Sequence, residues 1–199
     1  MKMKTWVVVL VKDFDSAKER LRPAMGARSR RALSRKNARL AVVAAAAGDR
    51  VLVVAGSDEV AELAQSWGAD VLLEPREEGQ NIAARRGINR ALEKGAGAVL
   101  LLSSDLPLVT SQAVADVIRA GSRLAPPAVV AVPAIGRGGT NALYMNPPDV
   151  AGLHFGEDSL TKFRADAESR GVEFVVHNSQ AIALDLDEPS DLERLSRAV

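Results

Sequence analysis

Cysteine is absent from this chain of 199 residues, and histidine is almost absent. Without cysteine there is no disulfide, no thiolate metal ligand and no thiolate nucleophile. The two histidines, His154 and His177, are isolated and lack the spacing of a metal site or a catalytic triad. No G-x-S-x-G segment occurs either, so the sequence offers no nucleophile for acyl transfer.

Glycine-rich phosphate loops are missing too. No G-x-G-x-x-G segment follows the first apolar run, and G-x-x-x-x-G-K-S/T occurs nowhere in the chain. Ordinary dinucleotide binding and P-loop hydrolysis depend on such loops, because their backbone amides approach the phosphate oxygens closely. The sequence therefore supports neither activity.

The chain has no excess of charge of one sign and no long apolar run. Lys and Arg number 26 against 25 Asp and Glu, which indicates neither a nucleic-acid nor a membrane partner. Met1–Val11 is too short to span a bilayer and carries no signal-peptide cleavage site. We expect a cytoplasmic protein, and 47% hydrophobic residues suffice for the core of one domain over residues 1–199.

In the first 120 residues, apolar runs alternate with helical patterns, which is typical of βαβ crossovers and a parallel sheet. The predicted strands are Trp6–Val11, Val51–Ala55, Val71–Leu73 and Ala98–Leu102. The predicted helices are 29–47, with Leu33, Leu40 and Val43 on its apolar side; 58–67; 81–92, capped by Asn81; and a helix to about 120, capped by Thr110 or Ser111.

The second half is less regular. Short strands are predicted at 129–132, 141–145 and 173–176, with helices at 158–170 and 190–197. The first two of these strands have no helix between them, which favours an antiparallel edge or flap on the parallel core. We predict an α/β fold, a Rossmann-like three-layer αβα sandwich with a mostly parallel sheet and an antiparallel portion. The short strands would also allow pairing across a homodimer.

Asp105 is the first candidate site residue. It follows the apolar run of Ala98–Leu108 (AVLLLSSDLPL), and Pro107 prevents that strand from continuing as a central one. Open α/β sheets bind their ligands at the carboxyl ends of the strands. The alternative is an ordinary turn or cap aspartate.

The loop after the first strand is rich in cations. Lys12, Lys18, Arg20 and Arg22 fall within eleven positions. At a strand end, lysine supplies a point charge and arginine a two-pronged donor, which suits a polyphosphate. The alternative is a solvated basic face.

Asp185 and Asp187 flank Leu186 shortly before Pro189. In an extended backbone residues two apart point to the same side, so both carboxylates would face one ion. With Asp105 they supply three hard oxygen donors, which suit Mg²⁺ held jointly with substrate phosphates. The alternative is that Asp187 or the adjacent glutamate caps the last helix.

Two further segments have binding potential. In GRGGT, Gly138 and Gly139 let the backbone approach a ligand and Thr140 adds a hydroxyl, although such a pair is also typical of a hairpin turn. In FGEDS, Gly156 and Ser159 precede a predicted helix, whose free amides favour an anion; a simple helix cap explains the same pattern.

Taken together, these segments resemble the 2-phospho-L-lactate guanylyltransferase family, which includes phosphoenolpyruvate guanylyltransferases. Six of them occur in the family's order: AKERLRP (17–23), GINRAL (87–92), SSDLPL (103–108), GGTNAL (138–143), FGEDS (155–159) and LDLDEPSDL (184–192). GGTNAL combined with D-x-D before a proline is fairly specific, whereas D-L-P is shared by many nucleotidyltransferases.

The resemblance implies a nucleotide-diphospho-sugar transferase-like fold of the molybdopterin-guanine-dinucleotide-synthase group. It implies Mg²⁺-dependent joining of GTP to 2-phospho-L-lactate or phosphoenolpyruvate, with release of pyrophosphate, to give the guanylylated precursor of coenzyme F-420. Asp105, Asp185 and Asp187 match metal positions; Lys18, Thr140, Gly156 and Ser159 match positions that hold the phosphorylated acid; and Asp105, Lys18 and Arg20 are the expected catalytic residues.

Two alternatives remain at this point. One is a nucleotidyltransferase for another acceptor, such as 3-phosphoglycerate, a sugar phosphate or molybdopterin; the lack of an L-A-A-G-x-G loop argues against the sugar and molybdopterin acceptors. The other is a non-catalytic nucleotide-binding domain, which would not need three aspartates. The chain also departs from the family's K-P-L-x-x-A-K by reading KDFDSAK, which weakens the assignment of Lys12 to phosphate binding.

Overall fold

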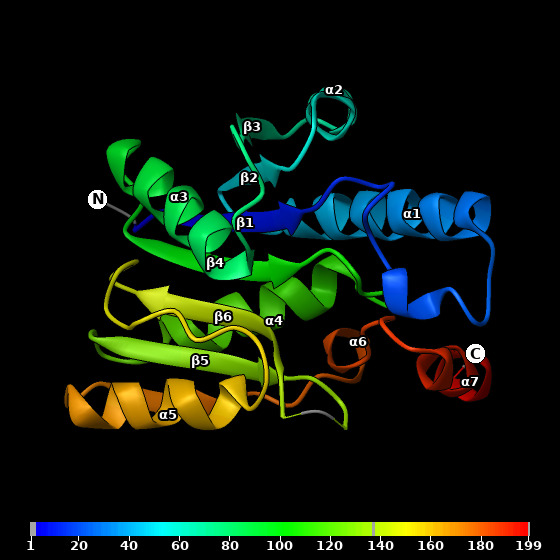
Figure 1. Cartoon of the computed structure of the whole chain (residues 1–199). Helices are drawn as coiled ribbons and strands as arrows, with labels where there is room; N and C mark the ends of the chain where they lie inside the picture. Colours follow the sequence, from blue (N-terminus) through cyan, green and yellow to red (C-terminus); the bar gives the residue numbers. More distant parts are fainter. Residues whose placement is uncertain (1–2, 137, 199) are drawn as a thin grey trace.

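The computed structural model describes residues 3–136 and 138–198, and its strands form one seven-stranded sheet in the order β3-β2-β1-β4-β6-β5-β7 (Figure 1). The strands are β1 (Thr5–Val11), β2 (Arg50–Ala55), β3 (Asp70–Leu73), β4 (Ala98–Ser103), β5 (Ala128–Pro133), β6 (Thr140–Asn146) and β7 (Glu173–Val176). The helices are α1 (Ala27–Ala45), α2 (Asp58–Ser66), α3 (Gln80–Glu93), α4 (Ser111–Ser122), α5 (Ser159–Ser169), α6 (Gln180–Ala183), α7 (Pro189–Ala198) and the 3₁₀ helix η1 (Glu19–Leu21).

The first four strands form the parallel half of the sheet, as predicted. β1 pairs in parallel with β2 on one side and β4 on the other, so that Val9 lies opposite both Val53 and Leu102. These runs are β-branched or leucine-rich because both faces of a central parallel strand are buried. The carboxyl ends of the four strands lie on the same side of the sheet, where a ligand site is expected.

The predicted antiparallel portion is confirmed, but its reversed strand, β6, lies inside the sheet and not at an edge. β6 runs antiparallel to β4 and to β5, while β7 pairs in parallel with β5 at the edge. Every residue of β6 is buried. Because β6 runs in the opposite direction, its first residues lie beside the carboxyl ends of its neighbours β4 and β5.

Helices cover both faces of the sheet and give two hydrophobic cores (Figure 1). Alternation along β1 sends Val7 and Val9 to the core under α1, α2 and α4, and Trp6 and Val8 to the core under α3 and α5. The predicted three-layer αβα architecture is therefore confirmed. In the described part of the chain, no helix has the length and apolar character of a membrane span.

The apolar side predicted for α1 is only partly right: Leu40 packs against the core, but the other buried positions are not those predicted. Val43 is exposed, whereas Arg30, Ser34 and Asn37 lie on the buried face together with small alanines. Alanine gives little hydrophobic signal in a sequence, although it is readily buried. The hydrophobic period of the sequence therefore indicated only part of the buried face.

One local prediction also needs correction. Asn81 does not cap α3, because Gly79 occupies the N-cap and the Asn81 side chain bonds elsewhere. The final helix begins at Pro189, and Asp191 in its first turn accepts hydrogen bonds from the backbone amides of Asp187 and Glu188. By contrast, the Thr110 cap of α4 is confirmed by a bond from the Ala113 amide at 3.1 Å.

Candidate active site

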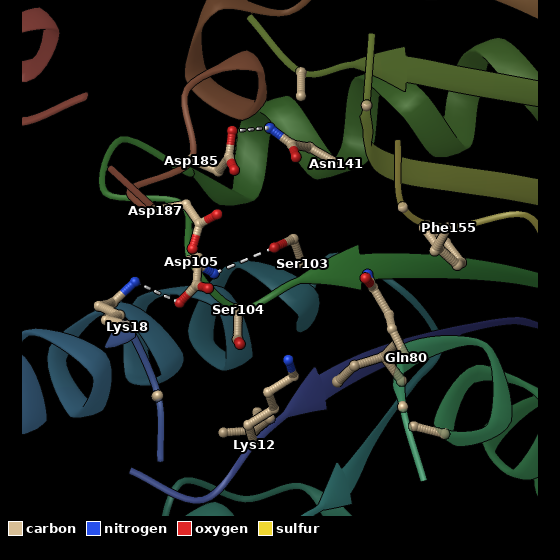
Figure 2. Close-up of a pocket in the computed structure, with 18 of the residues that line it drawn as sticks. Lys12, Lys18, Gln80, Ser103, Ser104, Asp105, Asn141, Phe155, Asp185 and Asp187 are labelled. Atoms are coloured by element: carbon tan, nitrogen blue, oxygen red, sulfur yellow. Dashed lines mark hydrogen bonds and ion pairs between the residues drawn. The ribbon is translucent and has the colours of Figure 1, made fainter. Parts of the chain in front are cut away.

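A pocket lies at the carboxyl ends of β1, β2, β4 and β5, beside the first residues of β6 (Figure 2). It is lined by the loops after β1 and β4, the loop between β3 and α3, the β5–β6 turn, the start of α5 and the segment that precedes α7. Of the predicted site residues, Lys12, Lys18, Arg20, Asp105, Thr140, Gly156, Ser159, Asp185 and Asp187 line this pocket. Arg22 does not; it pairs with Glu19 at 2.6 Å on the surface.

Lys18 is the buried cation of the pocket. Its side chain is 1% exposed, and its Nζ donates to Asp105 Oδ1 at 2.7 Å and to the Leu186 carbonyl at 2.8 Å. The backbone of Lys18 is left-handed, with φ of 60°, which strains a non-glycine residue by about 1–2 kcal/mol. The two charge-assisted bonds offset this strain and fix the ammonium group in place.

Leu186 ties the D-x-D segment to the strand end that carries Asp105. Its amide donates to the Asp105 carbonyl at 3.0 Å and its carbonyl accepts from Lys18, while its side chain is fully buried. Because Leu186 points inward, both Asp185 and Asp187 line the pocket. The predicted alternation therefore holds over these three residues, although the segment is irregular rather than a strand.

Asn141 is a pocket residue that the sequence did not single out. It is buried, and its Nδ2 donates to the carbonyls of Ile182 and Ala183 at 2.9 and 3.1 Å and lies 3.5 Å from Asp185 Oδ1 (Figure 2). It thereby joins the start of β6 to the D-x-D segment. The only available signal was its place in GGTN, next to Thr140 at the end of the glycine-rich turn.

The remaining two cations of the pocket differ in their partners. Arg20 is exposed and bridges Asp187 at 2.9 Å and Glu188 at 3.8 Å. Lys12 follows β1 directly and makes no hydrogen bond or ion pair with the described part of the chain. Lys12 is therefore available to an anionic ligand without breaking an ion pair, whereas Arg20 would first have to leave its carboxylate partners.

The start of β6 and the start of α5 meet at one side of the pocket. The Ser159 hydroxyl donates to Thr140 Oγ1 at 3.0 Å, and both residues are buried. The Leu160 amide donates to the Gly138 carbonyl at 3.0 Å, which joins α5 to the glycine-rich turn. The Ser159 hydroxyl is thus engaged inside the protein, so the Thr140 hydroxyl hydrogen and the amides of the first turn of α5 other than that of Leu160 are the donors that remain for a ligand.

The opposite side is the loop between β3 and α3. Glu77 accepts a hydrogen bond from the Asp13 amide at 2.7 Å and packs on Gly56, where a Cβ would lie only 2.8 Å from that amide. Arg86 donates to Glu74 at 2.6 Å and pairs with Glu78. Hydrogen bonds to Glu74 and Glu78 raise the pKa of Arg86. The loop is thereby held at both ends.

The charge of the pocket bears on which ligands it can hold. Nine carboxylate side chains line it against three cationic ones. A phosphate-bearing substrate would be repelled by that excess unless a cation came with it.

In residues 3–136 and 138–198, no three acidic or histidine side chains form a ready-made metal cluster. One oxygen each of Asp105 and Asp187 bonds to a cationic side chain, and their second oxygens make no bond to the described protein. Hard oxygen donors thus fit a divalent cation that arrives with its phosphate ligands.

The fold is that of the nucleotidyltransferases. A nucleotidyl transferase from Methanothermobacter thermautotrophicus superposes with a TM-score of 0.68 over 98% of this chain and 97% of that chain, at 17% sequence identity. The sequence defines the family more closely. A family model described as "Guanylyl transferase CofC like" matches residues 5–196, so the chain belongs to the CofC-like guanylyl transferase family.

Individual relatives support the same family over nearly the full length. A phosphoenolpyruvate guanylyltransferase from Conexibacter woesei is 36% identical over 99% of this chain and 89% of its own. A 2-phospho-L-lactate guanylyltransferase from Methanothermobacter thermautotrophicus is 34% identical over 96% of this chain and 83% of its own. The resemblance identified from the six sequence segments is therefore confirmed.

Proposed function

We propose that this protein transfers the guanylyl group of GTP to phosphoenolpyruvate or 2-phospho-L-lactate. A phosphate oxygen of the acid attacks the α-phosphorus of GTP, the α–β phosphoanhydride bond breaks, and pyrophosphate leaves. The product joins the acid to GMP through a new phosphoanhydride (P–O–P) bond and would serve as the precursor of coenzyme F-420. The observation that carries the proposal is the Lys18–Asp105 pair, with Leu186 bonded to both, in the pocket of a guanylyl transferase fold.

The pocket offers two approaches to Asp105. β4, which ends at Ser103 two residues before Asp105, lies between β1 and β6 in the sheet, so the loops after β1, β2 and β3 are on one side and Thr140 is on the other. GTP would occupy the β1–β3 side, where Lys12, which has no partner among the described residues, would meet phosphate oxygens. The acid would occupy the β6 side, where Thr140, Gly156 and the start of α5 supply donors.

Asp105, Asp185 and Asp187 would hold Mg²⁺. When bound, the ion would neutralise phosphate charge and polarise the α-phosphoryl group. Lys18 keeps Asp105 in position and contributes a fixed positive charge, and Arg20 would contact phosphate when it leaves Asp187. No general base is required, because the attacking phosphate is already ionised at neutral pH. Positioning and charge neutralisation therefore carry the catalysis, which agrees with a site that lacks cysteine and a histidine in its lining.

A pyrophosphate-release assay tests the proposal. GTP, ATP and CTP are each combined with phosphoenolpyruvate, 2-phospho-L-lactate and 3-phosphoglycerate in the presence of Mg²⁺. Release with GTP and one of the first two acids, and not with GTP alone, is the expected result. Turnover only with 3-phosphoglycerate would keep guanylyl transfer and change the acceptor. No turnover with any pair, together with tight GTP binding, would favour the non-catalytic binding domain instead.

A further inference from the structure

Asn81 connects two walls of the pocket through its side-chain amide. Its Nδ2 donates to the Phe155 carbonyl at 3.1 Å, and the Phe155 amide donates to Asn81 Oδ1 at 2.8 Å, although the two residues are 74 positions apart. Within residues 3–136 and 138–198, these are the only hydrogen bonds between α3 and the loop that joins β6 to α5. The Asn81 side chain thus satisfies both the amide and the carbonyl of Phe155, as the backbone of a neighbouring strand would.

The bonded loop is the one that leads into the acid side of the pocket. The Phe155 ring packs edge-on against Phe163 of α5 at 5.1 Å, and Phe155 lines the pocket opposite Lys18 (Figure 2). Gly156 follows with φ of +125°, a conformation that L side chains rarely adopt. The ring anchors Phe155 on one side only, and Asn81 holds its backbone on the other. Together they set the path of the chain through Gly156 to Ser159.

The Asn81 bonds matter little for the stability of the fold. Both are exposed to solvent, so water can replace them when the amide is removed. Gly79, not Asn81, is the N-cap of α3, and the core residues of α3 lie on its other positions. Asn81 lies outside both cores, next to the pocket residue Gln80, and holds a loop of the site with two hydrogen bonds, so its position is suited to function.

We propose that Asn81 is a positioning residue for the phosphorylated acid. This inference rests on the proposed function. Asn81 does not contact the reacting atoms; it holds Phe155 and Gly156 against the nucleotide half of the pocket, so that the donors at Gly156 and the start of α5 meet an acid that lies in line with the α-phosphorus. Displacement of reactants by about 1 Å lowers rates by as much as about 100-fold in comparable sites.

The primary test is the Asn81→Ala variant. It should raise the KM for the acid about tenfold or more, with the KM for GTP within about twofold of the wild type. Ile82→Ala is the matched control, because Ile82 is the next residue of α3 and is 42% exposed. Its two KM values should stay near those of the wild type. An unchanged acid KM in Asn81→Ala, or equal increases for both substrates, would overturn the proposal.

A double-mutant cycle with Gly156→Ala separates positioning from general damage. A Cβ on Gly156 has open space around it, but its positive φ forces the backbone to shift. If both residues act through the place of Gly156, the double variant should raise the acid KM no further than the more severe single variant. Additive increases would show that Asn81 acts elsewhere and would contradict the proposal.

The wild-type assay distinguishes failure of the function from failure of this inference. If the wild type turns over GTP with an acid and Asn81→Ala matches it, only the inference fails. If the wild type turns over no pair, the proposed function fails, and with it the acid that Asn81 was to position. Amide hydrogen exchange then still reports on the contact: faster exchange at 153–158 in Asn81→Ala, with no change in global stability, shows a loop-holding residue whose ligand differs.

Discussion

The ammonium of Lys18 lies 2.7 Å from a carboxylate oxygen of Asp105, and the two side chains differ sharply in exposure, 1% against 40%. The lysine approaches from inside the protein, while the aspartate faces the pocket. In this pair, the Lys18 ammonium is buried, whereas the Asp105 carboxylate is accessible to ligands. A change in the lysine affects the fold and the site together, whereas a change in the aspartate affects chiefly the site.

Lys18→Met tests the first half of this statement. The variant fills the same space but leaves the Leu186 carbonyl without its donor, so we expect a loss of about 1–3 kcal/mol in the free energy of unfolding. Turnover should fall at least about 100-fold, because Asp105 and the D-x-D segment lose their common tie. Urea unfolding and pyrophosphate release measure the two effects. Arg22→Ala, a surface cation outside the pocket, should change stability by less than about 0.5 kcal/mol. Full turnover by Lys18→Met would refute its proposed role.

Asp105→Asn tests the second half. The amide keeps the shape of the side chain and removes the charge that a divalent cation would need, so turnover should fall at least about 100-fold while circular dichroism stays that of the wild type. In the wild type, a chelator should abolish pyrophosphate release and added Mg²⁺ should restore it. Pyrophosphate release that persists under chelation would argue against a metal at these aspartates.

Gly56→Ala tests the packing of the loop between β3 and α3. A Cβ at Gly56 would meet the Glu77 carboxylate and lie 2.8 Å from the Asp13 amide, so the loop must move. We expect a loss of about 1–3 kcal/mol in unfolding free energy and a raised KM for GTP. Gly26→Ala is the matched control, because nothing lies within 4 Å of its Cβ position and its φ is −68°. If the two variants are equally stable, the contact at Gly56 is not tight.

Asp166 gives a prediction for pH. Burial tends to raise the pKa of its carboxyl, but the Gly152 amide at 2.7 Å, Arg170 at 3.0 Å and His154 favour the charged form and bring the pKa below its ordinary value. A lowered folded-state pKa contributes stability that is fully present above the unfolded pKa of about 3.9 and is lost as the pH falls toward the folded value.

Asp166→Asn should therefore be less stable than the wild type at pH 7, and the gap should narrow as the pH falls from about 5 to 2. Thermal unfolding at a series of pH values measures the gap. Asp116→Asn, on the exposed face of α4, should stay within about 0.5 kcal/mol of the wild type at pH 7. A constant gap across the acid range would show that Asp166 acts only through packing.

The parallel half of the sheet was predictable because β-branched runs bounded by polar turns have few other solutions. The runs at β1, β2 and β4 were found within a residue or two of their ends. The position of β6 was not predictable, because a buried run looks the same whether its neighbours run parallel or antiparallel to it. The buried face of α1 was missed because alanine and serine carry almost no hydrophobic signal.

For the site, the sequence indicated side chains but not partners. Lys12, Arg20 and Arg22 look equivalent along the chain. In the described residues, however, Lys12 has no partner, Arg20 bridges two carboxylates of the pocket and Arg22 pairs at the surface. These differences arise from the fold of the loop, with its left-handed turn at Lys18 and the 3₁₀ helix after it. The roles of Asn81 and Asn141 were not predictable, because each bonds to backbone groups that are distant in sequence.

The reversal of β6 has a consequence for how such an enzyme can diversify. Because β5 ends and β6 begins at the pocket, the turn between them lies beside the ligand site, where the Gly138 carbonyl bonds to the Leu160 amide and the Ile135 amide bonds to the Ala183 carbonyl. Residues can be inserted or deleted in this turn without shifting a strand register. Acceptor preference can then change over evolutionary time in the turn alone, while the strands that carry Asp105 and the cation loop stay constant.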